Sequence, residues 1–304
     1  MQKSALTNRI RRGLSEPHLV VRELNKYYYR SRKKKGKNDG VEMFEEDWDN
    51  LIILDACRYD TFAQRHTLPG TLEQKKSKVS STIEWLDTYL DGADLRDTVY
   101  ITANPQLYRK RDRVDVQFHA VEHIWQDDGW DDEFRTVRPE TVAKRMKQAA
   151  ETYPNKKIVG HFIQPHYPFI GETGQKHMDL DSLDFWNRVL NGEVTLDDEI
   201  LWQAYEENFD LCMPIVEDLL ETLQGKTVVT ADHAEMIGER SSPIPMKEYG
   251  HPTELHTPEL TTIPWHTYQN GERKEITVGD DSETTTRDET ADVVQERLQD
   301  LGYA

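Results

Sequence analysis

The most informative segment of this chain is Thr227-Val228-Val229-Thr230-Ala231-Asp232-His233-Ala234-Glu235. It begins with a short run of β-branched residues, which is typical of a buried strand. An aspartate and a histidine follow at the point where this strand should meet a loop. A carboxylate oxygen and an imidazole nitrogen can then reach one point beyond the end of the strand. Oxygen and nitrogen donors in this arrangement indicate a metal site.

A second segment repeats this design, because the apolar run Leu51-Ile52-Ile53-Leu54 ends in an aspartate. Strand and helix patterns alternate from about residue 50 onward, and the longest helical pattern covers residues 197–223. Such alternation predicts an α/β fold, a three-layer αβα sandwich around a mainly parallel sheet. Ligands of these sheets bind beyond the carboxyl ends of the strands. The candidate residues at those ends are Asp55, His166, Asp232 and His233.

The chain is polar and acidic. It has 304 residues, a net charge of −18 and a mean hydropathy of −0.80, with 36% hydrophobic residues. Seven Trp, thirteen Tyr and regular apolar runs nevertheless predict a packed fold rather than disorder. An acidic surface is typical of proteins that work in high salt, so we expect a halophilic archaeon as the source. The alternative is an ordinary acidic cytosolic protein.

Two features bear on the compartment. Cys57 and Cys212 lie in apolar contexts, and two cysteines make no disulfide framework, so we expect both in the core. No apolar run approaches the roughly 18–20 residues that span a bilayer, and no signal-peptide pattern is present. We expect a cytoplasmic protein, with peripheral attachment to the inner membrane face as an extension.

The basic residues concentrate at the start of the chain. Residues 1–37 hold 12 of the 38 Lys and Arg but only 2 of the 56 Asp and Glu, interleaved with Leu24 and Tyr27–Tyr29. Such a segment can bind anionic lipid or nucleic acid, and we favour lipid. The alternative is an arm that lies across the acidic body of its own domain or of a second subunit. We assign residues 1–40 to a basic arm and linker, and 41–304 to one catalytic domain.

Four segments, in this order, resemble the alkaline phosphatase and sulfatase superfamily. Leu54–Asp60 resembles its opening metal-binding segment, and Gln164–Pro168 resembles its substrate-binding histidine loop. Thr230–Glu235 resembles its second metal segment, with Ala234 where glycine is usual. Gly250-His251 resembles its late basic segment. The resemblance implies an alkaline-phosphatase-like fold and cleavage of an anionic ester.

The resemblance also implies a nucleophile at a helix start between the two metal segments. Sulfatases have Cys or Ser, then x-Pro-x-Arg, with a Gly ten residues after the nucleophile. Counting back from Gly92 gives Thr82, and the Cys/Ser-x-Pro-x-Arg pattern is absent. The resemblance is therefore closer to members with a threonine nucleophile, such as phosphatases, phosphodiesterases and phosphoglycerol transferases. Ser80 and Ser81 are rivals, and the alternative for Thr82 is an ordinary helix cap.

We expect one divalent metal, because two-metal members supply an Asp-x-x-x-His pair and no Asp lies four residues before His161, His166, His251 or His256. Mixed oxygen and nitrogen donors favour Mn²⁺ or Zn²⁺, with Mg²⁺ or Ca²⁺ as alternatives. His166 and His251 would bind the ester oxygens, and one of them would protonate the leaving group. For each, the alternative is a structural loop histidine. The resemblance gives the metal ligands as Asp55, Thr82, Asp232 and His233.

Several further residues have two interpretations. Arg58 either contacts substrate or pairs with Asp60, and Glu235 is expected to orient the metal loop. His161 and His256 are expected to be structural. Four tryptophans either form a wall for an acceptor group or pack in the core. They are Trp125, Trp130, Trp186 and Trp202.

These patterns together predict a metal-dependent hydrolase of phosphate mono- or diesters that works through a covalent intermediate on Thr82. One alternative is a sulfatase-like hydrolase of sulfuric esters, because phosphate and sulfate are similar in shape. Another is a transferase of a phospho-linked headgroup to a glycan or lipid, which would use the basic arm at a membrane. A protein that only binds is least favoured, since all four ligands are present. The oligomeric state stays open.

Overall fold

The fold is described from a computed structural model, which covers residues 17–33, 39–126, 128–178, 185–279, 283–285 and 289–303. The part of the predicted basic arm before residue 17, and its residues 34–38, lie outside the described residues. None of the described helices is both long and apolar enough to cross a membrane.

One eight-stranded sheet organises the molecule, with strand order β12-β4-β3-β7-β1-β8-β11-β2. Every neighbouring pair from β12 to β8 is parallel, and β11 and β2 are added antiparallel at one edge. The strands are β1 (Asn50–Leu54), β2 (Thr71–Lys76), β3 (Ala93–Thr102), β4 (Val116–His123), β7 (Lys157–Phe162), β8 (Gly225–Thr230), β11 (Thr262–Asn270) and β12 (Glu283–Thr285). Two small antiparallel pairs are β5 (Trp130–Asp131) with β6 (Thr136–Val137) and β9 (Met236–Arg240) with β10 (Lys247–Gly250).

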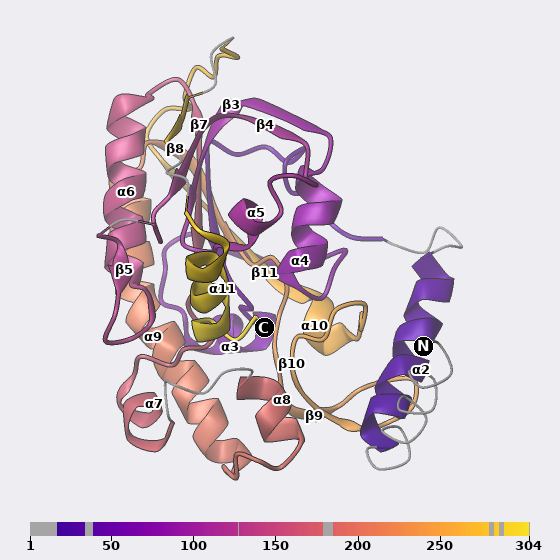
Figure 1. Cartoon of the computed structure of the whole chain (residues 1–304). Coiled ribbons are helices and arrows are strands. Elements are labelled where there is room, and N and C mark those ends of the chain that lie inside the picture. The colour runs from indigo at the N-terminus through magenta and orange to yellow at the C-terminus, as the bar shows by residue number, and fades with distance from the viewer. Residues whose placement is uncertain are drawn as a thin grey trace.

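Helices cover both faces of this sheet (Figure 1). Helices α6 and α9 lie along one face, and α4 and α5 lie on the other. The helices are α2 (Pro17–Lys33), α3 (Tyr59–Arg65), α4 (Thr82–Trp85), α5 (Gln106–Arg109), α6 (Pro139–Thr152), α7 (Glu172–His177), α8 (Phe185–Leu190), α9 (Asp198–Thr222), α10 (Pro258–Thr261) and α11 (Ala291–Asp300). The predicted three-layer α/β class with a mainly parallel sheet is confirmed.

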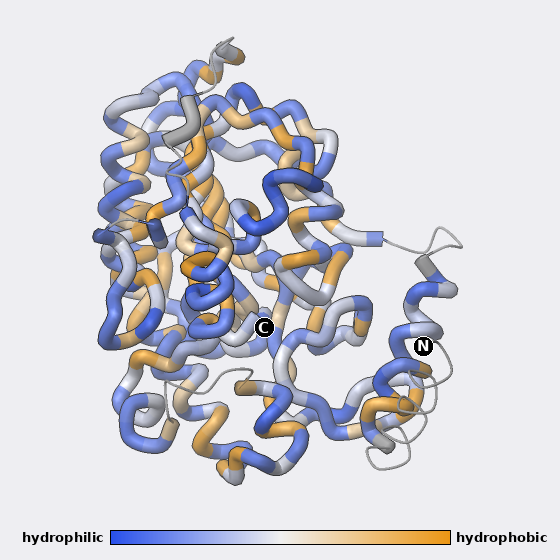
Figure 2. The backbone as a smooth tube through the Cα atoms, viewed as in Figure 1, coloured by the Kyte–Doolittle hydropathy of each residue, from blue (hydrophilic) through white to orange (hydrophobic). Residues whose placement is uncertain are grey.

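The core lies where the sequence is most apolar. All five residues of β1 are buried, and Figure 2 shows the hydrophobic residues gathered in the central strands. Cys57 and Cys212 are free thiols inside this core, as expected. A strand with helices on both faces must be apolar all round, so a short unbroken apolar run identifies it in the sequence.

The edge strand and the helix that carries Thr82 differ from the simple patterns. Strand β2 is mostly exposed and has no apolar run, and two of its six residues are lysines. Exposed edges carry such charges because they discourage pairing with another chain. The helical pattern after Thr82 is split, with an α-helical turn over Thr82–Trp85 and a π-helix over Leu86–Leu90.

The described part of the arm forms α2, which stands at the side of the molecule next to β9 (Figure 1). Asn25 is buried there, and its Nδ2 donates to Ser241 Oγ at 3.1 Å and to the Ile244 carbonyl oxygen at 2.9 Å. Arg30 Nε donates to Glu254 Oε2 at 2.7 Å. This part of the arm therefore lies across acidic side chains of its own domain, one of the two arrangements that its charge predicts.

Candidate active site at the strand ends

The two aspartates predicted as ligands leave the ends of neighbouring parallel strands. Ile53 of β1 is paired with Thr230 of β8, so Asp55 and Asp232 emerge side by side. His233 Nε2 lies 3.2 Å from Asp232 Oδ2 and 3.5 Å from Asp55 Oδ1. The structure thus brings three predicted ligands to one buried point, since all three side chains are fully buried.

Thr82 reaches the same point from α4. Its Oγ1 donates to Asp232 Oδ2 at 3.0 Å and lies 3.1 Å from His233 Nε2. The side chain that caps α4 belongs to Ser81, so Thr82 is free of the capping role that was its alternative. Ser80 is directed elsewhere, because its hydroxyl donates to Glu84 Oε2 at 2.9 Å. Of the three hydroxyl groups considered, Thr82 is the one beside the aspartates.

The sequence assigned His161 a structural role, but the structure places it in this group. His161 lies in β7, paired with Ile53 of β1, and its Nε2 is 3.8 Å from Asp232 Oδ2. Ligand atoms of Asp55, His161 and Asp232 all lie within 4.8 Å of one another. A histidine within a strand gives no signal of its own, whereas the pairing of β7 with β1 determines where it lies.

This group of residues fits a divalent cation, because two of its potential ligand atoms are buried and unpaired. Asp55 Oδ1 and His161 Nε2 are buried and have no hydrogen-bond partner among the described residues. Burial and the neighbouring Asp232 raise the pKa of Asp55 well above its usual range. Burial also acts to raise the pKa of Asp232, but His233 and His161 bring it below its ordinary value. Two buried carboxylates this close need a compensating positive charge, and a metal ion supplies one.

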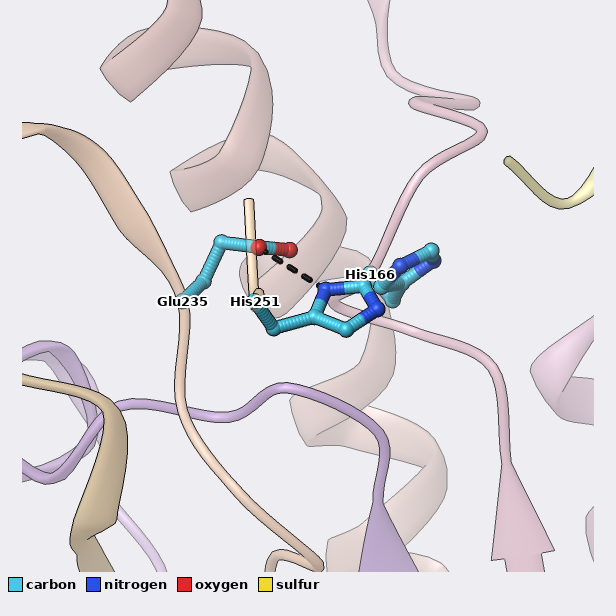
Figure 3. A group of neighbouring side chains, drawn as sticks. All are labelled: His166, Glu235 and His251. Carbon is cyan, nitrogen blue, oxygen red and sulfur yellow. Dashed lines mark hydrogen bonds and ion pairs between the residues drawn. The ribbon is translucent and has the colours of Figure 1, made fainter. Parts of the chain in front are cut away.

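A second cluster of candidate ligands lies beside the first. Ligand atoms of His166, Glu235 and His251 lie within 4.8 Å of one another, and His251 Nδ1 is 3.1 Å from Glu235 Oε1 (Figure 3). Glu235 Oε2 and His166 Nε2 are buried without a hydrogen-bond partner in the described part of the chain. This cluster could hold an ion as well as contact substrate, so the geometry also admits a second metal beyond the one expected.

Stacked rings connect the two clusters. The ring of His251 stacks on His233 with centroids 4.6 Å apart, and it meets His166 edge-on at 4.8 Å. Burial lowers the pKa of His251 to about 4 and raises the pKa of Glu235 to about 7. The neutral imidazole is the form that can bind a metal or accept a proton.

Two further residues contact Asp55 from distant parts of the chain. Asn104 Nδ2 donates to Asp55 Oδ2 at 3.1 Å, and the hydroxyl of Tyr303 donates to the same oxygen. The ring of Tyr303 also stacks on His166, with centroids 4.9 Å apart. Asn104 follows the carboxyl end of β3, so the strand-end rule could have identified it. Tyr303 follows α11 and has no such signal.

Arg58 supports the loops around the site. Its Nε donates to Asp60 Oδ1 at 2.9 Å, and its Nη1 donates to the Glu235 carbonyl oxygen at 2.6 Å and to Glu239. The guanidinium also lies over the ring of Trp202, 4.7 Å from its centroid. These bonds favour the structural interpretation over substrate contact, because protein acceptors occupy each nitrogen of the guanidinium.

The remaining histidine and tryptophans divide by position. His256 Nε2 lies 3.1 Å from Glu84 Oε1, outside both clusters, as expected of a structural residue. Trp125 is buried in the main core, as is Trp130. Trp186 lines a cavity of about 240 Å³ beside Thr82 and packs so closely on Gly250 that an added Cβ would lie 2.9 Å from it. Only Trp186 of the four tryptophans lines this cavity.

No protein-family model matches this chain, and no curated protein matches it. Several solved structures are similar to it. The soluble domain of lipooligosaccharide phosphoethanolamine transferase A from Neisseria meningitidis is 10% identical with a TM-score of 0.47, covering 72% of this chain and 75% of that one. The C-terminal periplasmic domain of phosphoethanolamine transferase EptC from Campylobacter jejuni is 11% identical with a TM-score of 0.45, covering 72% and 78%. The C-terminal periplasmic domain of EcEptC from Escherichia coli, in complex with Zn, is 14% identical with a TM-score of 0.43, covering 76% and 75%. Likeness at this level does not extend to the reaction or substrate of those proteins.

Proposed function

We propose that this protein is a metal-dependent enzyme that cleaves phosphate esters with Thr82 as nucleophile, resembling the threonine-nucleophile members of the alkaline phosphatase and sulfatase superfamily. One observation carries the proposal. The Thr82 hydroxyl oxygen lies 3.0 Å from Asp232 Oδ2 and 3.1 Å from His233 Nε2, in a buried cluster of ligand atoms. A threonine with only a packing role does not require hydrogen-bond contacts to a buried aspartate and a buried histidine.

The proposed ligands are Asp55, Thr82, Asp232 and His233, and the geometry adds His161 as a further donor. Nitrogen and oxygen donors favour Mn²⁺ or Zn²⁺. A bound divalent ion would lower the pKa of the hydroxyl and neutralise the charge of the ester.

Each of these residues then has a separate role in ester cleavage. The Thr82 oxygen forms a bond to phosphorus as its proton passes to Asp232 Oδ2, the acceptor of its hydrogen bond, and the bond from phosphorus to the alcohol oxygen breaks. His251 and His166 lie where they can hold the other phosphoryl oxygens, and His251 is oriented by its bond to Glu235. The anionic ester favours the protonated form of a histidine beside it, and the histidine so protonated gives the departing alkoxide a proton. The product of this step is a phosphothreonine and a free alcohol.

The second step decides between hydrolase and transferase. Water attacks the phosphothreonine in a hydrolase, whereas an acceptor hydroxyl attacks it in a transferase, and both regenerate the Thr82 hydroxyl. We propose hydrolysis as the leading reaction, with headgroup transfer to a glycan or lipid as its alternative. Sulfate-ester cleavage is the second alternative. It ranks below the others because a plain hydroxyl lacks the aldehyde chemistry of sulfatase nucleophiles.

Turnover of three aryl esters tests this proposal. We expect the protein supplied with Mn²⁺ or Zn²⁺ to release nitrophenol from 4-nitrophenyl phosphate or bis(4-nitrophenyl) phosphate, and to act at least about a hundredfold more slowly on 4-nitrophenyl sulfate. Added alcohols that raise nitrophenol release while lowering phosphate release would indicate transfer. Faster turnover of the sulfate than of both phosphates would overturn the proposal.

We also propose that α2 places the site against an anionic lipid surface, within a cytoplasmic protein. Val20, Leu24 and Tyr27 follow helical spacing on α2 and are 45%, 51% and 71% exposed. Arg32 lies on the same helix and is exposed, as is Arg30, whose guanidinium pairs with Glu254. Apolar side chains bordered by cations suit the boundary between anionic headgroups and acyl chains.

Sedimentation with vesicles tests this attachment. Replacing Val20, Leu24 and Tyr27 together by glutamine should lower the fraction that pellets with phosphatidylglycerol vesicles several-fold, because the apolar contact is lost while helix propensity is kept. The matched control is Leu211→Gln, which changes an exposed leucine of α9, 46% exposed, and should leave sedimentation unchanged. Substitution is preferable to deleting residues 1–37, because α2 also lines the cavity beside Thr82. Equal pelleting of the triple variant and the wild type would exclude the lipid contact.

A further inference from the structure

The cavity beside Thr82 has an unusual lining for so acidic a protein. Its volume is about 240 Å³, and its wall combines Thr82, His251 and Tyr303 with Arg22 and Lys26 of α2. Among the described residues that line it there is no Asp or Glu, although acidic residues outnumber basic ones by 56 to 38 in the chain. A cavity walled by cations and free of carboxylates favours an anionic occupant.

The two cations differ in how far the protein already neutralises them. Arg22 Nε donates to Glu248 Oε2 at 3.0 Å, a second bond joins the same carboxylate, and Nη1 donates to Asn187 Oδ1 at 3.2 Å. Lys26 has no hydrogen-bond acceptor among the described residues, and its nearest carboxylate oxygen, Glu23 Oε1, is 3.7 Å away. The hydrogen-bond donors of Arg22 are thus engaged within the protein, whereas the ammonium group of Lys26 can still donate hydrogen bonds to a ligand.

The surroundings of Lys26 strengthen its binding of an anion. Its side chain is only 17% exposed, and burial lowers its pKa despite the opposing charge of Glu23. An ammonium that has lost water without gaining acceptors binds an anion more strongly than an exposed one does. The lysines of the larger cavity between α2 and β2, about 710 Å³, already have carboxylate partners. These pairs are Lys75–Glu46, Lys76–Asp39 and Lys78–Glu42.

We propose that Lys26 is a specificity-determining residue that binds a second negative group, a carboxylate or a phosphate, on the alcohol part of the substrate. The proposal rests on the proposed function of Thr82, which takes the reacting phosphate. The cavity is smaller than the roughly 300–1,000 Å³ of typical ligand sites, so this part of the substrate is small. An alcohol that carries an ammonium group is disfavoured, because Lys26 repels it.

Four small phosphate esters that differ in the charge of the alcohol part test the proposal. They are ethyl phosphate, 2-phosphoglycolate, ethylene glycol bisphosphate and O-phosphoethanolamine. Affinities are measured by calorimetry with Mn²⁺ on Thr82→Ala protein, which keeps the esters intact, and phosphate release is measured on protein with Thr82. If Thr82 is not the nucleophile, phosphate release persists in Thr82→Ala protein, while the order of affinities still reports on Lys26.

We expect one or both of the esters with a second anionic group, 2-phosphoglycolate and ethylene glycol bisphosphate, to bind about tenfold more tightly than ethyl phosphate, and O-phosphoethanolamine to bind most weakly. Lys26→Gln should remove this preference and leave the affinity for ethyl phosphate unchanged, whereas Lys76→Gln, a matched change in the other cavity, should preserve it. In turnover, Lys26→Gln should raise KM for the preferred ester with little change in kcat. Equal affinities for the four esters, a preference that survives Lys26→Gln, or no detectable binding would each overturn the proposal. A surviving preference would indicate that the second anion contacts the metal instead.

Discussion

Alanine at position 82 is expected to reduce phosphate-ester turnover by at least about 10³-fold, because it removes the oxygen that forms the bond to phosphorus. The fold should persist. Thr82 is buried and 1% exposed, and its loss removes only a hydroxyl and a methyl group, worth about 1 kcal/mol of unfolding free energy. Turnover and thermal unfolding, measured on the same samples, separate the chemical effect from the structural one.

Serine is the matched control at this position. Thr82→Ser keeps the oxygen but loses the methyl group that restricts its rotation, so we expect turnover within about tenfold of the wild type. Ser81→Ala removes the side chain that caps α4 and should reduce stability while leaving the nucleophile in place. Nearly wild-type turnover by the Thr82→Ala variant would exclude Thr82 as the nucleophile.

Removal of the metal should abolish turnover and lower the free energy of unfolding. The substitution Asp55→Asn should restore stability to the metal-free protein. Asp55 and Asp232 are both fully buried, and Asp55 Oδ1 has no hydrogen-bond partner among the described residues. Without a cation, Asp55 either repels Asp232 or takes up a proton, as its raised pKa allows, and both states cost stability. An asparagine keeps an acceptor for Asn104 and Tyr303 and removes one charge, so metal-free Asp55→Asn should exceed metal-free wild type by about 1–3 kcal/mol in unfolding free energy.

Chemical unfolding of wild type and Asp55→Asn, each with chelator and with added Mn²⁺ or Zn²⁺, checks this prediction. With metal present the order should invert, because wild type gains binding energy that the variant lacks. Elemental analysis of the wild type would show whether the ion count is one or two, and Glu235→Gln would indicate whether the second cluster holds the additional ion. A metal-free variant that is less stable than metal-free wild type would show that Asp55 is not electrostatically strained.

The residues that the sequence identified share a local signal. Asp55, Asp232 and His233 each follow a short apolar run, and the ends of parallel strands in one sheet lie along one edge. Their meeting therefore follows from the strand assignment together with the pairing of β1 with β8. The resemblance to the superfamily implies Thr82, ten residues before Gly92, and the structure places its hydroxyl next to two of the predicted ligands.

The residues that sequence reasoning did not find depend on pairing and docking. His161 lies inside β7, and its place beside Asp232 requires knowing that β7 is next to β1. Lys26 belongs to a basic segment whose charge suggests an external partner, yet α2 docks on its own domain and turns this lysine toward the cavity. Neither fact follows from composition or periodicity, because both depend on contacts between residues distant in the sequence.

The bond from Tyr303 to Asp55 has a consequence for the order of assembly. The two residues are 248 positions apart, so the pocket reaches this form only after nearly all of this sequence has been synthesised and α11 has docked. Contacts of such long range are slow to form, because a long segment of chain must be ordered to close them. A growing polypeptide can therefore bury its central strands before its active site is complete. Proteolytic removal of the residues after Leu301 would leave a folded protein in which Asp55 lacks this hydrogen-bond donor.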